Sequence, residues 1–264
     1  MAERSHPVTP GSVYVWRGFK SSSLSYDQFA AFLGTVFVPA CALLQPRVGL
    51  RAYLPSMVPQ AGKPAVVPDQ TALMFWNDPK AHDEAKKAIA VRIYSNLHGD
   101  VYDMARSGTQ EVPKPLDPST VALAAEQPYY LLDQPADWML GAVHHLVGAR
   151  RPDLAPADFL SQAASGAKSL QQKPPSGVDG ILVCCGTDYL AAWVHVKGQS
   201  SGLGSALDGL AQLTQTVLRA DSQPLRLEAG LWDAWPGLDL LKTPCLNFQF
   251  DRPAAARPRA LGKS

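Results

Sequence analysis

The feature that most constrains the fold of this chain is a segment that occurs twice. Leu24 and Phe29 open a long apolar stretch, and Leu154 and Phe159 repeat this arrangement 130 residues later. In each copy a strand-like apolar run precedes the loop, and a helical pattern follows it. The chain is therefore expected to be a fused duplicate of one small α+β unit.

The first unit is expected to occupy residues 12–104, in the order strand, helix, strand, strand, helix. Ser25 and Gln28 form a capping-box pattern at the start of the first helix. Pro39 is expected to kink or end that helix, because proline lacks a backbone N–H. The strands are predicted at Val13–Phe19, which is rich in β-branched and aromatic residues, and at Val48–Val58 and Thr71–Trp76.

The second helix of this unit is predicted to start at Asp78 as its cap, with Pro79 in the first turn. His98-Gly99 suits its end. His82 and His98 are expected to be solvated helix residues. Four residues at helical spacing form the expected apolar face: Ala85, Ile89, Ile93 and Leu97.

A proline-rich connector is expected over residues 105–137, where Tyr129–Leu132 is a candidate for the fourth strand of the first unit. The second unit, residues 138–250, repeats the order, and residues 251–264 are expected to form a disordered tail. The second unit is predicted to contain two helices, one from Pro156 to about Leu170 and an amphipathic one from Leu203 to Val217. Its predicted strands are Trp138–Val147, the hairpin strands Ile181–Cys185 and Tyr189–Lys197, a closing strand at Arg226–Trp232 and an edge strand at Cys245–Phe250.

Each unit thus has the β-α-β-β-α-β order of a ferredoxin-like fold. The expected fold class is α+β, with two tandem ferredoxin-like units in one chain. Two such units can lay their sheets face to face and form an intrachain α/β barrel. The helices then lie outside, and an apolar cavity is expected between the sheets.

The charge of the chain bears on which partners it can bind, and its cysteines bear on the redox state of its compartment. The 24 basic and 23 acidic residues give a net charge of +1, which offers no electrostatic case for nucleic acid or a membrane surface. The four cysteines (Cys41, Cys184, Cys185 and Cys245) form no Cys-x-x-Cys pair and are expected to be buried free thiols. No apolar signal region begins the sequence, and no run approaches the ~18 apolar residues of a spanning helix. A soluble cytoplasmic protein is expected.

These residues resemble the dimeric α/β-barrel superfamily in a tandem form, and the first half resembles its EthD-like branch. The resemblance is carried by Leu24-Ser25 before Phe29, by Pro39 ten residues after Phe29, and by Trp76-Asn77-Asp78-Pro79 with Ala81. It covers residues 12–100 well and 138–235 loosely. The branch usually carries a histidine two residues before the proline. This chain has Phe37 there, and Ala167 at the aligned place in the second half.

The resemblance implies three alternative functions, because members of the superfamily include cofactor-free monooxygenases, isomerases, cyclases and dehydratases as well as haem enzymes. The first is a small-molecule enzyme that uses cofactor-independent acid–base chemistry or oxygenation on an aromatic or polyketide-like substrate. The second is a haem protein, with His195 or His144 as axial ligand and Arg17 or Arg226 as a distal or propionate partner. The third is a non-catalytic ligand-binding protein, which the absence of the histidine at Phe37 motivates.

Three side chains of the second unit are the candidate catalytic set. Alternation along a strand places Tyr189, Trp193 and His195 on one face, which suits a cavity. The ferredoxin-like order puts the first strand between the third and the fourth, so His144, His195 and Glu228 are expected to converge. A histidine with a carboxylate in an apolar pocket is a plausible acid–base set. The alternative is that these are hydrogen-bonded barrel residues, and no spacing typical of a metal site occurs.

Aromatic side chains on the predicted strands are the candidate substrate-binding residues, although each is equally suited to an ordinary core. They are Tyr14, Trp16, Tyr53, Trp76, Trp193 and Trp232. The expected partner is a small hydrophobic or aromatic substrate. Both sheets are expected to pair within one chain, which leaves room for a homodimer through an outer face.

Overall fold

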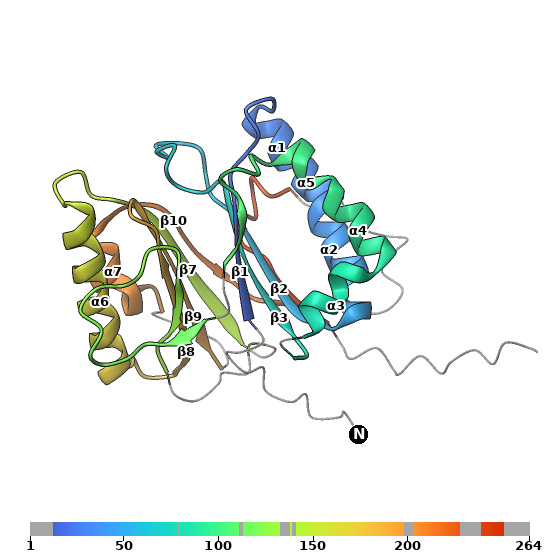
Figure 1. Cartoon of the computed structure of the whole chain (residues 1–264). Coiled ribbons are helices and arrows are strands. Elements are labelled where there is room, and N and C mark those ends of the chain that lie inside the picture. The colour runs from blue at the N-terminus through green and yellow to red at the C-terminus, as the bar shows by residue number, and fades with distance from the viewer. Residues whose placement is uncertain are drawn as a thin grey trace, which may run out of the picture.

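The structure of the chain is a computed structural model that describes residues 13–78, 80–110, 113–132, 138, 141–197, 203–227 and 239–250. Two six-stranded sheets lie face to face, and helices cover the outer side of each (Figure 1). The α+β class predicted from the sequence is confirmed. The predicted tail, residues 251–264, lies outside the described residues.

The first sheet is built around three antiparallel strands from the first half of the chain. β3 lies between β1 and β2, and β4 lies on the other side of β1. The full order is β11-β12-β2-β3-β1-β4. The strands are β1 Val13–Gly18, β2 Leu50–Met57, β3 Gln70–Trp76, β4 Gly108–Gln110, β11 Pro224–Leu227 and β12 Asn247–Phe250.

The second sheet has the same arrangement in the second half of the chain. β9 lies between β7 and β8, and β10 lies on the other side of β7. The full order is β10-β7-β9-β8-β6-β5. The strands are β5 Lys114–Pro115, β6 Pro128–Tyr130, β7 Ala142–Arg150, β8 Val178–Cys185, β9 Tyr189–Val196 and β10 Thr214–Ser222.

Each sheet also takes two strands from the other half of the chain. β5 and β6 follow the first half in sequence, but β6 pairs antiparallel with β8. β11 and β12 follow the second half, but β12 pairs antiparallel with β2. In both places the outer strand runs parallel to the inner one. The two halves therefore repeat one arrangement and exchange two strands each.

Several predicted strands lie elsewhere than expected. The strand that completes the first sheet beside β1 is β4, whereas the predicted segment Tyr129–Leu132 overlaps β6 of the second sheet. The predicted closing strand, Arg226–Trp232, overlaps β11 of the first sheet, and its residues from Glu228 onward lie outside the described residues. The predicted edge strand at Cys245–Phe250 is β12, which lies between two strands rather than at an edge.

The first helix layer begins with a long helical segment under the first sheet. In α1 (Tyr26–Phe32) the Ser25 side chain accepts from the Gln28 backbone and the Gln28 side chain accepts from the Ser25 backbone, so the predicted capping box is confirmed. Pro39 does not end the helix. A π-helical turn, η2 (Leu33–Phe37), leads into α2 (Val38–Leu44) and the 3-10 turn η3 (Gln45–Val48). The wider turn before Pro39 relieves the clash that proline makes with the preceding turn of a regular α-helix.

The second part of this layer is three short helices rather than one. They are α3 (Ala81–Lys87), α4 (Ile89–Asn96) and α5 (His98–Val101). Asp78 accepts from the backbone N–H groups of Lys80 and Ala81, but α3 begins at Ala81 with Lys80 as its N-cap, so the predicted cap is wrong by two residues. Ala88 has an extended backbone, which breaks the helix and shifts the phase of its buried face. The predicted apolar face is therefore wrong at Ile89 and Ile93, which are 75% and 64% exposed.

The second sheet has a simpler cover. α6 (Pro156–Gln172) runs uninterrupted, close to its predicted bounds. A 3-10 turn, η4 (Leu203–Leu207), and α7 (Asp208–Ala211) follow β9. The helix predicted to reach Val217 ends at Ala211, because the next residues pair with β7 as β10. Thr214, Thr216 and Val217 are β-branched, which favours a strand.

The space between the two sheets is a packed core rather than the predicted cavity. Trp138, Trp193 and Phe75 are at most 1% exposed, and they pack with aliphatic side chains from both sheets. Phe75 and Trp138 stack with ring centroids 5.2 Å apart. Within the described residues no backbone ladder joins a strand of one sheet to a strand of the other, so the predicted barrel is not closed by a continuous ladder.

One helical segment is longer and more apolar than was expected from the sequence for any part of this chain. Tyr26–Val48 spans 23 residues with a mean hydropathy of 1.7 in its most apolar window, which is long and apolar enough to cross a bilayer by length and composition alone. In this window 56% of the residues are buried within the molecule. Phe29, Leu33 and Phe37 belong to the apolar cluster against the first sheet, as in a core helix.

Candidate functional site

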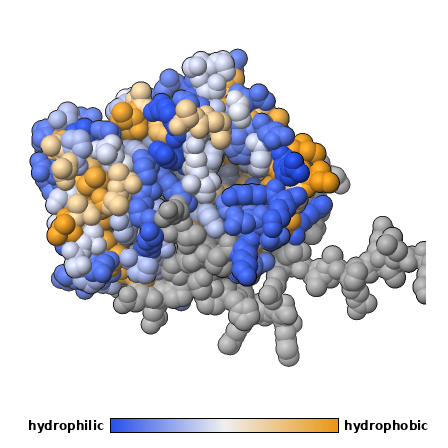
Figure 2. All heavy atoms as spheres, viewed as in Figure 1, coloured by the Kyte–Doolittle hydropathy of each residue, from blue (hydrophilic) through white to orange (hydrophobic). Residues whose placement is uncertain are grey.

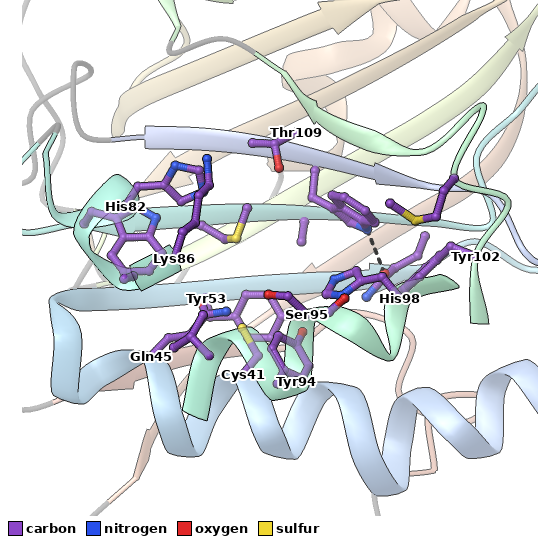
Figure 3. A pocket seen from close by; sticks show the side chains of 18 residues that line it. Cys41, Gln45, Tyr53, His82, Lys86, Tyr94, Ser95, His98, Tyr102 and Thr109 are labelled. Atoms are coloured by element: carbon purple, nitrogen blue, oxygen red, sulfur yellow. Dashed lines mark hydrogen bonds between the residues drawn. The ribbon is translucent and has the colours of Figure 1, made fainter. Parts of the chain in front are cut away.

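A cavity of about 240 Å³ lies between the outer face of the first sheet and the helices that cover it (Figure 3). It is larger than an engineered apolar cavity of about 150 Å³ that holds benzene, so its volume suits a bicyclic aromatic molecule. Its lining comprises Trp16, Cys41, Gln45, Tyr53, Gln70, Ala72, Met74, Trp76, His82, Ala85, Lys86, Val91, Tyr94, Ser95, His98, Tyr102, Met104 and Thr109.

Three of the six predicted substrate-binding residues line this cavity. Trp16, Tyr53 and Trp76 come from β1, β2 and β3 and face the helices. Tyr14 lies beside it, with its ring 4.0 Å from that of His82, which does line the cavity. Alternation along the strands brings these aromatic side chains to one face of the sheet.

A hydrogen-bonded centre stands at one end of the cavity. The hydroxyl of Tyr102 donates to Gln70 Oε1 over 2.5 Å, and Trp16 Nε1 donates to the same oxygen over 3.2 Å. Burial raises the pKa of Tyr102 well above its ordinary value, so its hydroxyl stays protonated. The Gln70 amide therefore fixes an indole and a phenol in the wall of the cavity.

Cys41 of α2 and Tyr94 of α4 lie on the helix side of the cavity, and Tyr53 faces them from β2 (Figure 3). Burial is the main cause that raises the pKa of all three groups. A thiol that remains protonated is a poor nucleophile. This group of residues therefore supplies hydroxyl and thiol hydrogen bonds rather than covalent chemistry.

His98 is the side chain in this cavity best prepared to take up a proton. Its Nδ1 lies 2.8 Å from the carbonyl oxygen of Ser95. A carbonyl only accepts, so Nδ1 carries the hydrogen and Nε2 keeps a free electron pair. Burial lowers the pKa of His98, which keeps the ring neutral at pH 7. The rings of Trp16 and Tyr102 lie 5.4 and 5.6 Å from the imidazole.

A second neutral histidine lies toward the other end of the cavity. His82, predicted to be solvated, is only 8% exposed. Burial, with a further contribution from the Lys86 ammonium, lowers its pKa to about 4. Its ring packs edge-on against Trp76, with centroids 5.4 Å apart. In Figure 3 His82, Lys86 and Gln45 lie at this end, away from His98 and Tyr102. The cavity thus has two chemically different ends.

The predicted catalytic histidines of the second half do not converge. The register places His144 opposite Val194 and His195 opposite Val143 on paired strands, so the two imidazoles project from opposite faces of the sheet. Each has its own carboxylate partner: His144 Nδ1 lies 2.5 Å from Asp221, and His195 Nδ1 lies 2.5 Å from Asp179. The expectation of a shared site is wrong. A register shifted by one residue would have put both imidazoles on the same face of the sheet.

The other predicted site residues lie apart from the cavity or outside the described part of the chain. Trp193 stacks on His145 between the sheets, with centroids 4.7 Å apart. Burial lowers the pKa of His145 to about 3. Glu228 and Trp232 lie outside the described residues, as does Pro79 of the predicted helix start.

The residues of the cavity do not fit a haem. His144 and His195 belong to the second half and do not line it, and its lining contains no arginine for a propionate. Arg17 instead forms an ion pair with Glu126 over 3.2 Å, and Arg226 lies in β11 of the first sheet. The volume of about 240 Å³ suits a molecule of two fused rings and is too small for the macrocycle of four pyrrole rings in a haem. Among the described residues, no group of three or more His, Cys, Asp or Glu side chains could hold a metal ion.

Sequence reasoning missed the helix side of the cavity. Tyr94, His98 and Tyr102 follow one another at intervals of four residues, and Cys41 and Gln45 have the same spacing. Residues at i and i+4 share a helix face. The signal was therefore present, but the continuous helix predicted through Ala88 assigned His98 to the solvent.

Comparisons with known proteins leave the family open. No protein-family model matches the chain, and no curated protein matches it. Among solved structures, a candidate monooxygenase from Lactobacillus acidophilus NCFM is 8% identical, with 78% of this chain and 92% of the other covered and a TM-score of 0.33. A candidate monooxygenase from Fusobacterium nucleatum is 12% identical, with 79% and 88% covered and a TM-score of 0.34. An anthrone oxidase-like protein is 8% identical, with 79% and 87% covered and a TM-score of 0.32. Likeness at these TM-scores carries no argument about this chain.

Proposed function

We propose that the protein is a small-molecule enzyme whose active site is the cavity of the first half, with His98 as the general base. The observation that carries this proposal is the fixed tautomer of His98, whose Nδ1 is held 2.8 Å from the Ser95 carbonyl. A neutral imidazole with a free Nε2 is the form that accepts a proton. The enclosing rings favour an aromatic or polyketide-like substrate.

The proposed chemistry starts with transfer of a proton from an acidic C–H or phenolic O–H of the substrate to His98 Nε2. The electron pair of the broken bond stays on the substrate, where the aromatic ring delocalises it. The Tyr53 and Tyr94 hydroxyls line the same cavity and keep their protons, so they are available to donate to a developing oxyanion. Return of the proton at another carbon isomerises the substrate. Expulsion of a neighbouring hydroxyl group, which takes the proton from His98 and leaves as water, gives lyase chemistry. Reaction of the anion with O2 forms a carbon–oxygen bond and a peroxide anion, which takes the proton from His98 and loses water to leave a carbonyl, so that O2 is the oxidant.

The proposed fold is two tandem ferredoxin-like units, related to the EthD-like branch in the first half. It is supported by the strand order within each sheet, where the first strand of each half lies between its third and fourth. The haem alternative loses support because the cavity does not fit the group. The four free, buried cysteines agree with the proposal of a reducing, cytoplasmic environment.

The base can be tested before the natural substrate is known. Bicyclic aromatic ketones such as 1-tetralone exchange their acidic α-hydrogens when a base attacks them, so deuterium incorporation from D2O reports proton abstraction. We expect the protein to accelerate exchange above buffer and His98→Gln to lower that acceleration by about 10²–10⁴-fold. His82→Gln is the matched control and should retain most of the rate. Unchanged exchange in His98→Gln would refute the assignment of the base.

The fate of the substrate anion distinguishes the possible reactions. Product analysis by mass spectrometry in air and under nitrogen separates oxygenation, which needs O2, from isomerisation or elimination, which do not. Ligand binding without exchange or conversion across a panel of hydroxylated and oxidised bicyclic aromatics would instead support a non-catalytic binding protein.

A further inference from the structure

The end of the cavity opposite His98 contains buried polar atoms that make no hydrogen bond to any residue that the structure describes. Gln45 is 8% exposed, and its buried Oε1 makes no hydrogen bond to any described residue. Trp76 is 2% exposed, and its indole N–H finds no acceptor in the described part of the chain. Buried polar groups are nearly always paired in folded proteins, so unpaired ones that line a cavity indicate a ligand.

Most of these groups can donate a hydrogen bond. Trp76 Nε1 only donates. The Gln45 oxygen accepts, but a 180° turn of the amide puts its NH2 group in the same place, where it donates to a ligand. The neutral His82 ring carries one N–H, and its Nδ1 makes no hydrogen bond to any residue that the structure describes. A ligand group that only accepts hydrogen bonds suits this set better than one that donates.

Lys86 adds a positive charge at the same end. Among the described residues that line this cavity it is the only lysine or arginine, and its side chain is 59% exposed at the rim. Asp83 pairs with it over 3.4 Å, but Asp83 is itself 69% exposed. An exposed pair of this kind contributes little stability, so the ammonium is free to turn to a ligand.

We propose that Lys86, Gln45 and Trp76 bind a carboxylate of the substrate, so that the enzyme acts on an aromatic acid whose reactive ring faces His98. A carboxylate is an acceptor-only group with two oxygens and a negative charge. This inference rests on the proposed function for the location of the site, but it adds the class of substrate. The cavity then binds the substrate in one direction, with its charged end at the rim and its ring inside.

The test compares three bicyclic probes of similar shape by isothermal titration calorimetry: 2-naphthoate, 2-naphthamide and 2-naphthol. We expect 2-naphthoate to bind about tenfold more tightly than 2-naphthamide at low salt, because only the carboxylate makes a charge-assisted contact. The difference should shrink in about 0.5 M salt, which screens that contact. Lys86→Met should remove most of this preference and leave the affinity for 2-naphthamide within about twofold.

Lys87→Met is a matched control, because Lys87 is the next residue, is similarly exposed and pairs with Glu84, but does not line the cavity. It removes the same charge and should change neither affinity. Equal affinity for naphthoate and naphthamide, or equal losses in Lys86→Met and Lys87→Met, would overturn the carboxylate inference. If 2-naphthol still binds in that case, the cavity proposal stands. If none of the three probes binds, both proposals fall.

Discussion

The two halves of this molecule have the same strand order, but the side chains that lie between the sheet and its helices differ between the halves. The register pairs Trp16 with Ala72 in the first half and Leu146 with Ala192 in the second, which makes these pairs structurally equivalent. The register of the remaining strands extends this equivalence to the other residues that line the cavity from the sheet. In order, Trp16, Tyr53, Gln70, Ala72, Met74 and Trp76 correspond to Leu146, Ile181, Leu190, Ala192, Val194 and Val196. An aromatic and polar lining in one half therefore stands where the other half is wholly aliphatic.

The helices differ in the same sense. On α6, the buried residues Ala163, Ala164 and Ala167 are small, so little holds this helix away from the second sheet. At the equivalent positions of the first half, Leu33 and Phe37 are large and Gly34 is small. Beside them, α3, α4 and α5 stand where the second half has only η4 and α7. The comparison teaches that two halves with the same order of strands need not both contain a ligand cavity. The size of a few side chains decides which half has a cavity.

The surface seen in Figure 2 does not distinguish the two halves. In Figure 2 hydrophilic and hydrophobic residues are interspersed over both described halves, as on the outer face of a folded protein. The apolar residues that distinguish the halves are therefore those inside the layers rather than those on this face.

The largest expected effect comes from cutting the chain between the halves. Because β5 and β6 complete the second sheet while β11 and β12 complete the first, a fragment of residues 1–135 lacks two strands of its own sheet and carries two of the other. Each fragment also exposes one face of the core between the sheets. Fragments 1–135 and 136–264 should be insoluble or self-associate when expressed separately and form a soluble complex together, as gel filtration will show. Two soluble monomers would mean that the halves are independent.

Acid should weaken the half with the cavity more than its partner. His82 has its pKa lowered to about 4 in the folded chain, chiefly by burial, whereas the unfolded chain takes up that proton near pH 6.5. The unfolded state therefore binds more protons between these values, and stability is lost as pH falls from 6.5 toward 4. The loss from this one group is about 3 kcal/mol by pH 4.

Hydrogen exchange at pH 7 and pH 5 checks this expectation. Amides of α3 should lose protection in acid more than those of α6, and His82→Gln should reduce the difference. The buried His145, with a pKa of about 3, adds an acid sensitivity in the core that both halves share. If His82→Gln and the natural chain lost stability equally between pH 7 and pH 5, the burial of His82 would be misjudged.

Local patterns predicted much of the first half. Two correct predictions are the Ser25–Gln28 cap and the alternation that brings Trp16, Tyr53 and Trp76 to one face. The first depends on neighbours in sequence, and the second depends on the period of a strand. The exchange of strands could not be predicted in this way, because the partners of β6 and β12 are distant in sequence and each strand is only 3 or 4 residues long.

The candidate site was misplaced for two physical reasons. The extended backbone at Ala88 turns His98 toward the cavity, and a single alanine gives no sign of such a break. In the second half, the alternation within each strand was predicted correctly, but His144 was assigned to the same face as His195. The register between β7 and β9 puts them on opposite faces. A shift of one residue exchanges the two faces of a strand.

The central claim, that the first half holds a ligand cavity where the second half is filled, is tested by one pair of equivalent substitutions. Ala72 and Ala192 are both at most 1% exposed, and leucine adds the same volume at each. Ala192→Leu should overpack the aliphatic layer and lower the free energy of unfolding by about 1–3 kcal/mol, while 2-naphthol still binds. Ala72→Leu should project into the cavity, leave the free energy of unfolding nearly unchanged and abolish binding of 2-naphthol. Urea unfolding and calorimetric titration of both variants give the answer. Equal destabilisation by the two substitutions, or undiminished binding in Ala72→Leu, would contradict the claim.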